Sequence, residues 1–126
     1  MSFGADDAKM IQGIWKPVTA VLGGKPMPPP VVKAITLTLT NGMYDVAVEG
    51  ERSDKGTVKL DPKASPRKMT ITGTDGPNLG KTFLAIYELK EDILRICYDL
   101  SGEKFPTEYK SIEGTKLYLV TYKRQH

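Results

Sequence analysis

The residues with the greatest chemical reactivity in this sequence are few and far apart along the chain. A nucleophilic cysteine needs a histidine or a cation beside it. Cys97 is the one cysteine, and the one histidine is the terminal residue, His126. These two residues cannot complete the four ligands of a zinc site. We therefore interpret Cys97 as a structural residue, and we expect no metal and no cofactor.

Acidic side chains near the C-terminal strands are a second source of chemistry. Glu88, Asp99 and Glu108 fall on or beside predicted strands, where a barrel wall can bring two acids together for proton transfer. Their spacing does not require this, and charged residues on strands usually face solvent. We therefore expect the chain not to be an enzyme. Arg95 alternates with apolar residues, so it faces solvent in one register and enters the interior as an anion-binding candidate in the other.

Residues 76–82, Gly-Pro-Asn-Leu-Gly-Lys-Thr, are similar to a phosphate-binding loop. That motif requires four residues between its glycines, and this segment has three. It also leads into a predicted strand, so no helix N-terminus would face a phosphate. We interpret the segment as a turn-rich connector.

Aromatic and apolar side chains on the predicted strands are the remaining candidates for a site. Core packing explains most of them. If the interior is hollow, however, they would line a pocket that is mostly apolar with a few polar groups. The ligand-binding candidates are Leu37, Tyr44, Val46, Phe83, Tyr87, Tyr98 and, in its inward register, Arg95.

Short β-strands must position these residues. Residues 35–40 alternate between apolar side chains and threonine, which predicts a half-buried strand, and Asn41-Gly42 predicts a hairpin turn after it. A second turn is predicted at Gly50-Glu51. Bulges are expected at Pro17 and Gly56. The predicted strands cover residues 12–22, 35–40, 43–49, 52–60, 67–73, 82–89, 93–100 and 116–124.

The segments between and before these strands have other signals. Residues 1–10 are predicted to be a flexible N-terminal arm with a short helical turn at 5–10, followed by one domain at 11–126. The proline-rich segment 25–30 is a connector, with a helical turn near 31–33. Residues 107–110 are expected to extend a strand.

Eight strands joined mostly by tight turns predict an all-β fold. Sequential strands usually pair, and a meander that closes into an antiparallel barrel removes its edges. The interior of such a barrel holds side chains or one small ligand. A two-sheet β-sandwich is the alternative.

Composition excludes several classes of protein. The 126 residues are 40% hydrophobic and 26% charged, with a net charge of +3. Because the basic residues are scattered, we expect no nucleic-acid partner. No apolar run is long enough for a membrane span. The first ten residues do not resemble a signal peptide, which favours the cytoplasm, although a single cysteine is compatible with export.

Gly13-Ile14-Trp15 on the first strand resembles the opening of the lipocalins. In that family the tryptophan plugs the closed end of the barrel, and a cation from the last strand covers its indole. The resemblance therefore implies a structural closure by Gly13 and Trp15 with Arg124 or Lys123. It also places a binding site at the opposite end.

The chain from 11 to 124 is similar to a family of uncharacterised lipocalin-like domains, within the calycin barrels, best known from planctomycetes and other bacteria. The similar segments are 13–16, 22–26, 56–62, 74–82, 86–89, 94–97 and 106–109. Phe105 stands where the family often has arginine, and Ala85 where glycine is common. The resemblance implies a fold but no activity.

Three functions follow from these observations. The leading hypothesis is a non-enzymatic module that binds a small apolar ligand in the barrel. The alternative is a structural or protein-interaction module with a packed interior, with no partner indicated. The third is a small barrel enzyme.

Overall fold

The computed structural model describes residues 3–125, and within this range the side chains of residues 3–6, 52 and 53 are not described. In chain order the elements are α1 (Phe3–Met10), β1 (Gly13–Leu22), β2 (Lys25–Pro26), α2 (Pro29–Ala34), β3 (Ile35–Thr40), β4 (Met43–Val48), β5 (Glu51–Asp61), β6 (Lys68–Asp75), β7 (Thr82–Lys90), β8 (Ile93–Asp99) and β9 (Leu117–Gln125). His126, the one histidine, lies outside the described residues, as do residues 1 and 2 of the predicted arm.

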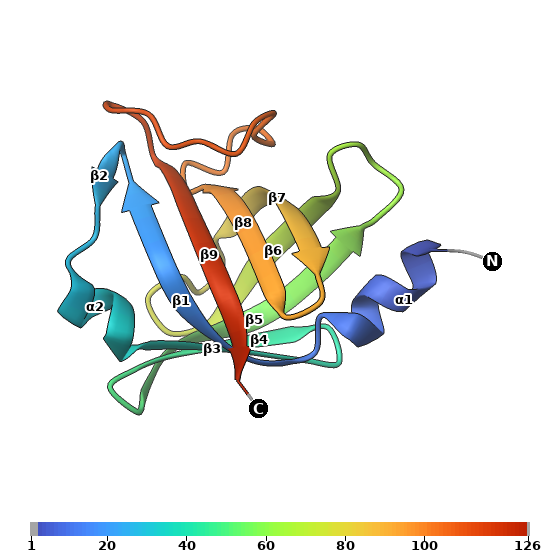
Figure 1. Ribbon diagram of the computed structural model, residues 1–126, viewed down its shortest axis with the longest axis horizontal. Helices are drawn as coiled ribbons and strands as arrows, with labels where there is room; N and C mark the ends of the chain where they lie inside the picture. Colours follow the sequence, from blue (N-terminus) through green and yellow to red (C-terminus); the bar gives the residue numbers. More distant parts are fainter. Residues whose placement is uncertain (1–2, 126) are drawn as a thin grey trace.

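Strands β1 and β3–β9 form a closed antiparallel barrel of eight strands (Figure 1). Each strand from β3 to β9 pairs with its neighbour in the chain, and β1 pairs with both β3 and β9. The predicted eight-stranded meander barrel is therefore confirmed. The sandwich alternative is wrong, because one hydrogen-bonded ladder runs around the molecule where a sandwich would have two separate sheets. Such a barrel is compatible with a lipocalin-like fold.

Two of the hairpin turns use left-handed backbone conformations. At residues 41–42 the φ angles are 50° and 76°, as a two-residue turn between twisted strands requires. At residues 49–50 they are 57° and 82°. This second turn begins one residue before the predicted one, because Glu51 already pairs with Val48 as the first residue of β5.

Both predicted strand irregularities are present. The register of β1 against β9 shifts between Pro17 and Thr19. Proline has no N–H to donate to the ladder, so a bulge is the arrangement that tolerates it. The register of β5 against β6 shifts between Lys55 and Gly56.

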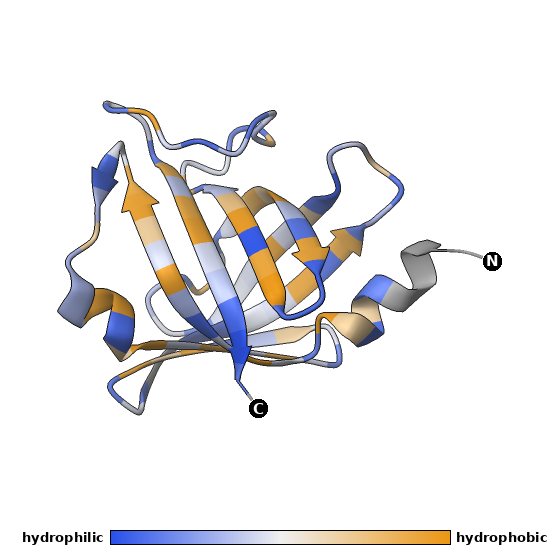
Figure 2. Cartoon of the chain, in the orientation of Figure 1, coloured by the Kyte–Doolittle hydropathy of each residue, from blue (hydrophilic) through white to orange (hydrophobic). Residues whose placement is uncertain are grey.

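The strands alternate between an inner and an outer face, visible as alternating bands in Figure 2. On β8, Leu94 and Ile96 are 0% and 1% exposed, whereas the Arg95 side chain between them is 40% exposed. The apolar residues therefore face the interior of the barrel, and Arg95 lies on its outer wall.

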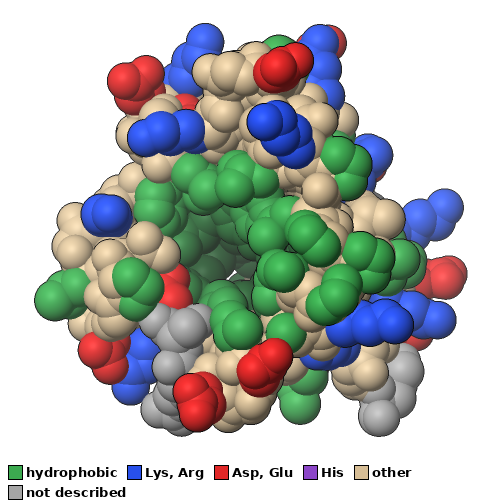
Figure 3. Space-filling view, turned by 90° about the vertical axis from the view of Figure 1, so that its left-hand side faces the viewer, with side chains coloured by type: hydrophobic (Ala, Val, Ile, Leu, Met, Phe, Trp, Pro, Cys, Tyr) green, Lys and Arg blue, Asp and Glu red, His purple; other side chains and the backbone are tan. Residues whose placement is uncertain are grey.

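The connections divide the barrel into two ends. Helix α1, residues 41–42, residues 62–67 and residues 91–92 lie at one end, which we call the closed end. Helix α2, residues 49–50, residues 76–81 and residues 100–116 lie at the other, which we call the mouth. Figure 3 looks at the left-hand side of Figure 1 and shows a hollow lined by hydrophobic side chains.

Both helices are attached to the barrel by side-chain hydrogen bonds. Strand β1 pairs with β3 only over Gly13–Trp15, and beyond this point Lys16 donates to the carbonyl of Lys33 in α2 over 2.9 Å. Part of the predicted flexible arm is helix α1, and it places Asp7 in a buried position, 5% exposed. Neither helix of the described chain has the length and apolar character that a membrane crossing requires.

Candidate functional site

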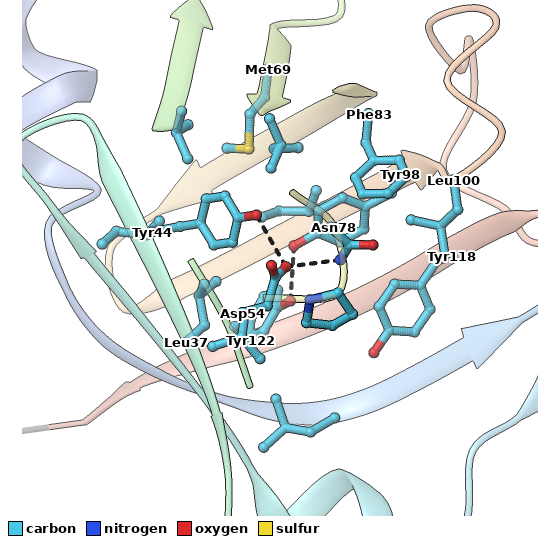
Figure 4. A pocket seen from close by; sticks show the side chains of 17 residues that line it. Leu37, Tyr44, Asp54, Met69, Asn78, Phe83, Tyr98, Leu100, Tyr118 and Tyr122 are labelled. Atoms are coloured by element: carbon cyan, nitrogen blue, oxygen red, sulfur yellow. Dashed lines mark hydrogen bonds between the residues drawn. The ribbon is translucent and has the colours of Figure 1, made fainter. Parts of the chain in front are cut away.

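The barrel contains a cavity of about 300 Å³ that reaches the mouth. Side chains from strands β3–β9 and from the loops at the mouth line it (Figure 4). Most of these side chains are apolar or aromatic. They are Ile35, Leu37, Leu39, Tyr44, Val46, Asp54, Val58, Met69, Ile71, Pro77, Asn78, Phe83, Ile96, Tyr98, Leu100, Tyr118 and Tyr122.

Strand register brings these residues to one face. Leu37 lies opposite Val46, and Tyr44 lies opposite Gly56. A Cβ atom at Gly56 would approach Tyr44 Cε1 to 2.8 Å and the Thr72 carbonyl oxygen to 2.0 Å. Glycine at this position therefore leaves room for the Tyr44 ring inside the barrel.

Asp54 of β5 lies at the centre of a small cluster of polar side chains in this otherwise apolar cavity (Figure 4). Its Oδ2 accepts a hydrogen bond from Tyr44 Oη over 3.0 Å and another from Asn78 Nδ2 over 2.9 Å. Its Oδ1 is buried and has no hydrogen-bond partner among the described residues. One oxygen of the carboxylate is thus fully used, and the other is left without a donor.

The loop at 76–81 brings Asn78 to this carboxylate. It folds back on β6, where Gly73 donates to the Lys81 carbonyl over 2.9 Å and accepts from the Gly80 N–H over 2.9 Å. A Cβ atom at Gly73 would lie 2.0 Å from the Asn78 carbonyl oxygen, so the close approach requires glycine. The segment that is similar to a phosphate loop is therefore a connector, and it leads into strand β7.

Tyrosine hydroxyls supply the other polar atoms of the cavity. The Oη atoms of Tyr98 and Tyr122 lie 2.9 Å apart, and the Tyr98 ring stacks on Tyr118 with centroids 5.5 Å apart. Burial raises the pKa of Tyr98 and of Tyr122, and the pKa of Tyr44 is raised by burial and then by its hydrogen bond to Asp54. These hydroxyls remain protonated at neutral pH and can donate hydrogen bonds.

The structure brings together five of the seven predicted ligand-binding residues. Leu37, Tyr44, Val46, Phe83 and Tyr98 line the cavity. The two remaining candidates, Tyr87 and Arg95, are not among its lining residues.

Tyr87 packs in the core nearer the closed end. It is 1% exposed, and its hydroxyl donates to Asp7 Oδ2 over 2.7 Å. Asp7 also accepts from Arg67 over 3.3 Å. Tyr87 therefore anchors helix α1 to the barrel and does not contribute a hydroxyl to the cavity.

Arg95 faces outward, so the alternative in which it enters the interior as an anion-binding residue is wrong. Its guanidinium carbon lies 4.3 Å from the centroid of the Tyr109 ring, and it forms an ion pair with Glu88. Because Leu94 and Ile96 occupy the inner face of β8, strand alternation places Arg95 outside.

The residues predicted to close the barrel meet at its closed end. Trp15 is 0% exposed, pairs with Arg124 in the β1–β9 ladder, and donates from Nε1 to the Ile11 carbonyl over 2.9 Å. The Arg124 guanidinium carbon lies 4.3 Å from the centroid of the Trp15 ring. A Cβ atom at Gly13 would lie 2.9 Å from Arg124 Nη1, so glycine gives the guanidinium its space.

The reactive residues considered from the sequence each have local partners. The Cys97 thiol is buried and donates to the Lys110 carbonyl over 3.4 Å, and burial raises its pKa, which disfavours the nucleophilic thiolate. Asp99 accepts hydrogen bonds from Ser101, and Glu108 pairs with Lys110. Among the described residues no group of three or more His, Cys, Asp or Glu side chains is arranged to hold a metal ion.

Sequence reasoning missed several lining residues, and the polar ones with side-chain hydrogen bonds to each other are Asp54 and Asn78. The signal for Asp54 was its spacing of two and four residues from Gly56 and Val58, which places all three on one face of β5. Asn78 carried no such signal, because its position depends on how a loop folds back over a neighbouring strand.

Comparison of the chain with protein-family models, with curated proteins and with solved structures finds no match.

Proposed function

We propose that this protein is a non-enzymatic binding module that holds a small, largely apolar molecule inside its barrel. The observation that carries the proposal is the cavity of about 300 Å³, apolar over most of its lining and reaching the mouth. Binding pockets for small molecules are concave and mostly apolar, with a few polar groups that orient the ligand. The volume lies at the lower end of the usual range of about 300–1,000 Å³, which favours a small ligand.

The structure of the closed end supports the mouth as the entrance through which a ligand would reach the cavity. Trp15 and Arg124 fill and cover the opposite end, and helix α1 is tied there through Asp7. We further propose that the chain belongs with the lipocalin-like domains that it resembles. The pairing of Gly13 and Trp15 on the first strand with Arg124 on the last supports this relationship.

A fluorescence titration with N-phenyl-1-naphthylamine, an apolar dye uncharged at neutral pH, tests the proposal. We expect saturable enhancement with one dye per chain for the native protein. In Val58→Trp the larger side chain fills the cavity, and we expect dye affinity to fall at least about tenfold, since an overpacked apolar site loses both room and contacts.

Val18→Trp is the matched control, because Val18 is 57% exposed and does not line the cavity. It should bind the dye as the native protein does, and far-UV circular dichroism should show both variants folded. Equal affinities in the two variants, or no saturable enhancement in the native protein, would contradict ligand binding. The latter result would favour the packed structural module.

A further inference from the structure

The cavity contains one charged residue, Asp54, among the 17 residues that line it. The rest of the described lining offers apolar side chains, an amide and tyrosine hydroxyls, and no lysine or arginine. A carboxylate in apolar surroundings costs free energy unless hydrogen bonds and an opposite charge stabilise it. Among the described residues that line the cavity, no positive charge compensates the carboxylate of Asp54.

The hydrogen bonds of Asp54 compensate only one of its oxygens. Tyr44 and Asn78 both donate to Oδ2, and both are neutral donors. These two bonds orient the carboxylate, as shown by the dashed lines of Figure 4. Oδ1 is buried without a partner among the described residues, an arrangement that costs free energy. Asp54 lines the cavity, so a ligand that brings a positive charge to this carboxylate supplies the compensation that two neutral donors do not.

We propose that the cavity selects a small apolar molecule that carries a protonated amine, with its ammonium group received by the carboxylate of Asp54. This inference rests on the proposed function and names the class of ligand for the same cavity. An ammonium group supplies both a hydrogen bond and the missing charge, whereas an alcohol supplies only the bond and a carboxylate is repelled. The rings of Phe83, Tyr98 and Tyr118 in the same lining give the apolar part of the ligand a surface to pack against.

Three probes with one hydrocarbon chain and different head groups test the inference. Octylamine, 1-octanol and octanoate would each displace N-phenyl-1-naphthylamine from the native protein at pH 7. We expect octylamine to compete at least about tenfold more tightly than 1-octanol, as a charge-assisted hydrogen bond implies, and octanoate to compete least.

Asp54→Asn removes the charge and keeps the shape of the side chain. We expect this variant to lose the preference for octylamine while its affinity for 1-octanol changes less than about threefold. Asp75→Asn is the matched control: it removes a charge at the mouth, where the Asp75 side chain is 69% exposed, and should keep the preference. Asp54→Ser serves the same purpose if Asp54→Asn does not fold.

The outcomes separate the inference from the proposed function. If the dye binds the native protein and octylamine competes no better than 1-octanol, the amine inference is wrong and the binding function stands. If the preference persists in Asp54→Asn or Asp54→Ser, Asp54 is not the receiving group and the inference is also wrong. If the dye does not bind the native protein, both fall together.

Discussion

Arg124 joins three segments of the chain at the closed end. Its guanidinium donates to the carbonyls of Met10 and Gln12 over 2.7 and 2.5 Å, and its Nε donates to Asp92 over 3.1 Å. Its face covers the ring of Trp15. The planar fork of arginine satisfies this geometry, whereas the single ammonium of lysine can replace only part of it.

We therefore expect Arg124→Lys to lower the free energy of unfolding by about 2–4 kcal/mol, since several charge-assisted hydrogen bonds and a cation–π contact are lost or weakened. Urea denaturation followed by the fluorescence of Trp15, the one tryptophan of the chain, measures the change. Lys123→Ala, on the exposed face of the same strand, should cost less than about 0.5 kcal/mol. Equal losses in the two variants would show that Arg124 does not hold the closed end.

The motif Gly13-Ile14-Trp15 indicates the closed-end residues from the sequence alone, whereas no motif indicates Asp54. The difference is physical. Trp15 is a large apolar side chain on a strand, and such residues are nearly always buried. An aspartate on a polar strand with a bulge is expected in solvent. Its spacing from Gly56 gives only the face that the two residues share, and the contacts with Tyr44 and Asn78 show that this face is the inner one.

At the scale of elements, the loop between β6 and β7 depends on a glycine whose role is steric. Gly73 has no side chain to separate the loop from the strand, and Asn78 therefore reaches Asp54. Gly80 of the same loop is required for a different reason. A Cβ atom there would meet nothing within 4 Å, but the φ angle of +80° is one that residues other than glycine rarely adopt.

Gly73→Ala and Gly80→Ala separate these two causes. We expect Gly73→Ala to lower the free energy of unfolding by about 2–3 kcal/mol through the clash with the Asn78 carbonyl. Gly80→Ala should cost about 1 kcal/mol through backbone strain alone. Urea denaturation of both variants provides the comparison, and a larger loss for Gly80→Ala would contradict the close packing of the loop on β6.

The hairpins were predictable because their signals are local. Asn41-Gly42 and the alternation on either side of it set the β3–β4 hairpin without reference to the rest of the chain. The strand expected at 107–110 did not form, because β8 already pairs with β7 on one edge and with β9 on the other. A closed barrel leaves no edge there for another strand, so this segment lies in the long loop 100–116.

At the scale of the whole molecule, burial links the ionisation of tyrosine to unfolding. Each of the 6 tyrosines has a raised pKa, with burial as the first cause in every case. The unfolded chain loses these phenol protons near its ordinary pKa of about 10, while the folded chain keeps them. Above that pH the unfolded state binds fewer protons than the folded state, so stability falls as pH rises.

We therefore expect the free energy of unfolding to fall above about pH 10, where the tyrosines of the unfolded chain ionise. Below this pH the contribution of the buried tyrosines to stability should be complete. Absorbance of tyrosinate at 295 nm and far-UV circular dichroism, recorded in one pH titration, should change together. Tyrosinate absorbance that rises near pH 10 while the circular dichroism remains native would contradict the burial of these side chains.

The all-β class, most strand positions and the closure of a meander were predictable from the amino-acid sequence, because turn chemistry and two-residue periodicity act over a few residues. Sequence reasoning also supplied seven candidates for the interior, of which five line the cavity: Leu37, Tyr44, Val46, Phe83 and Tyr98. The hollow interior and the place of Asp54 in it became visible only in the folded chain. Both depend on the sum of side-chain volumes and contacts across strands β3–β9, which no single stretch of the chain contains.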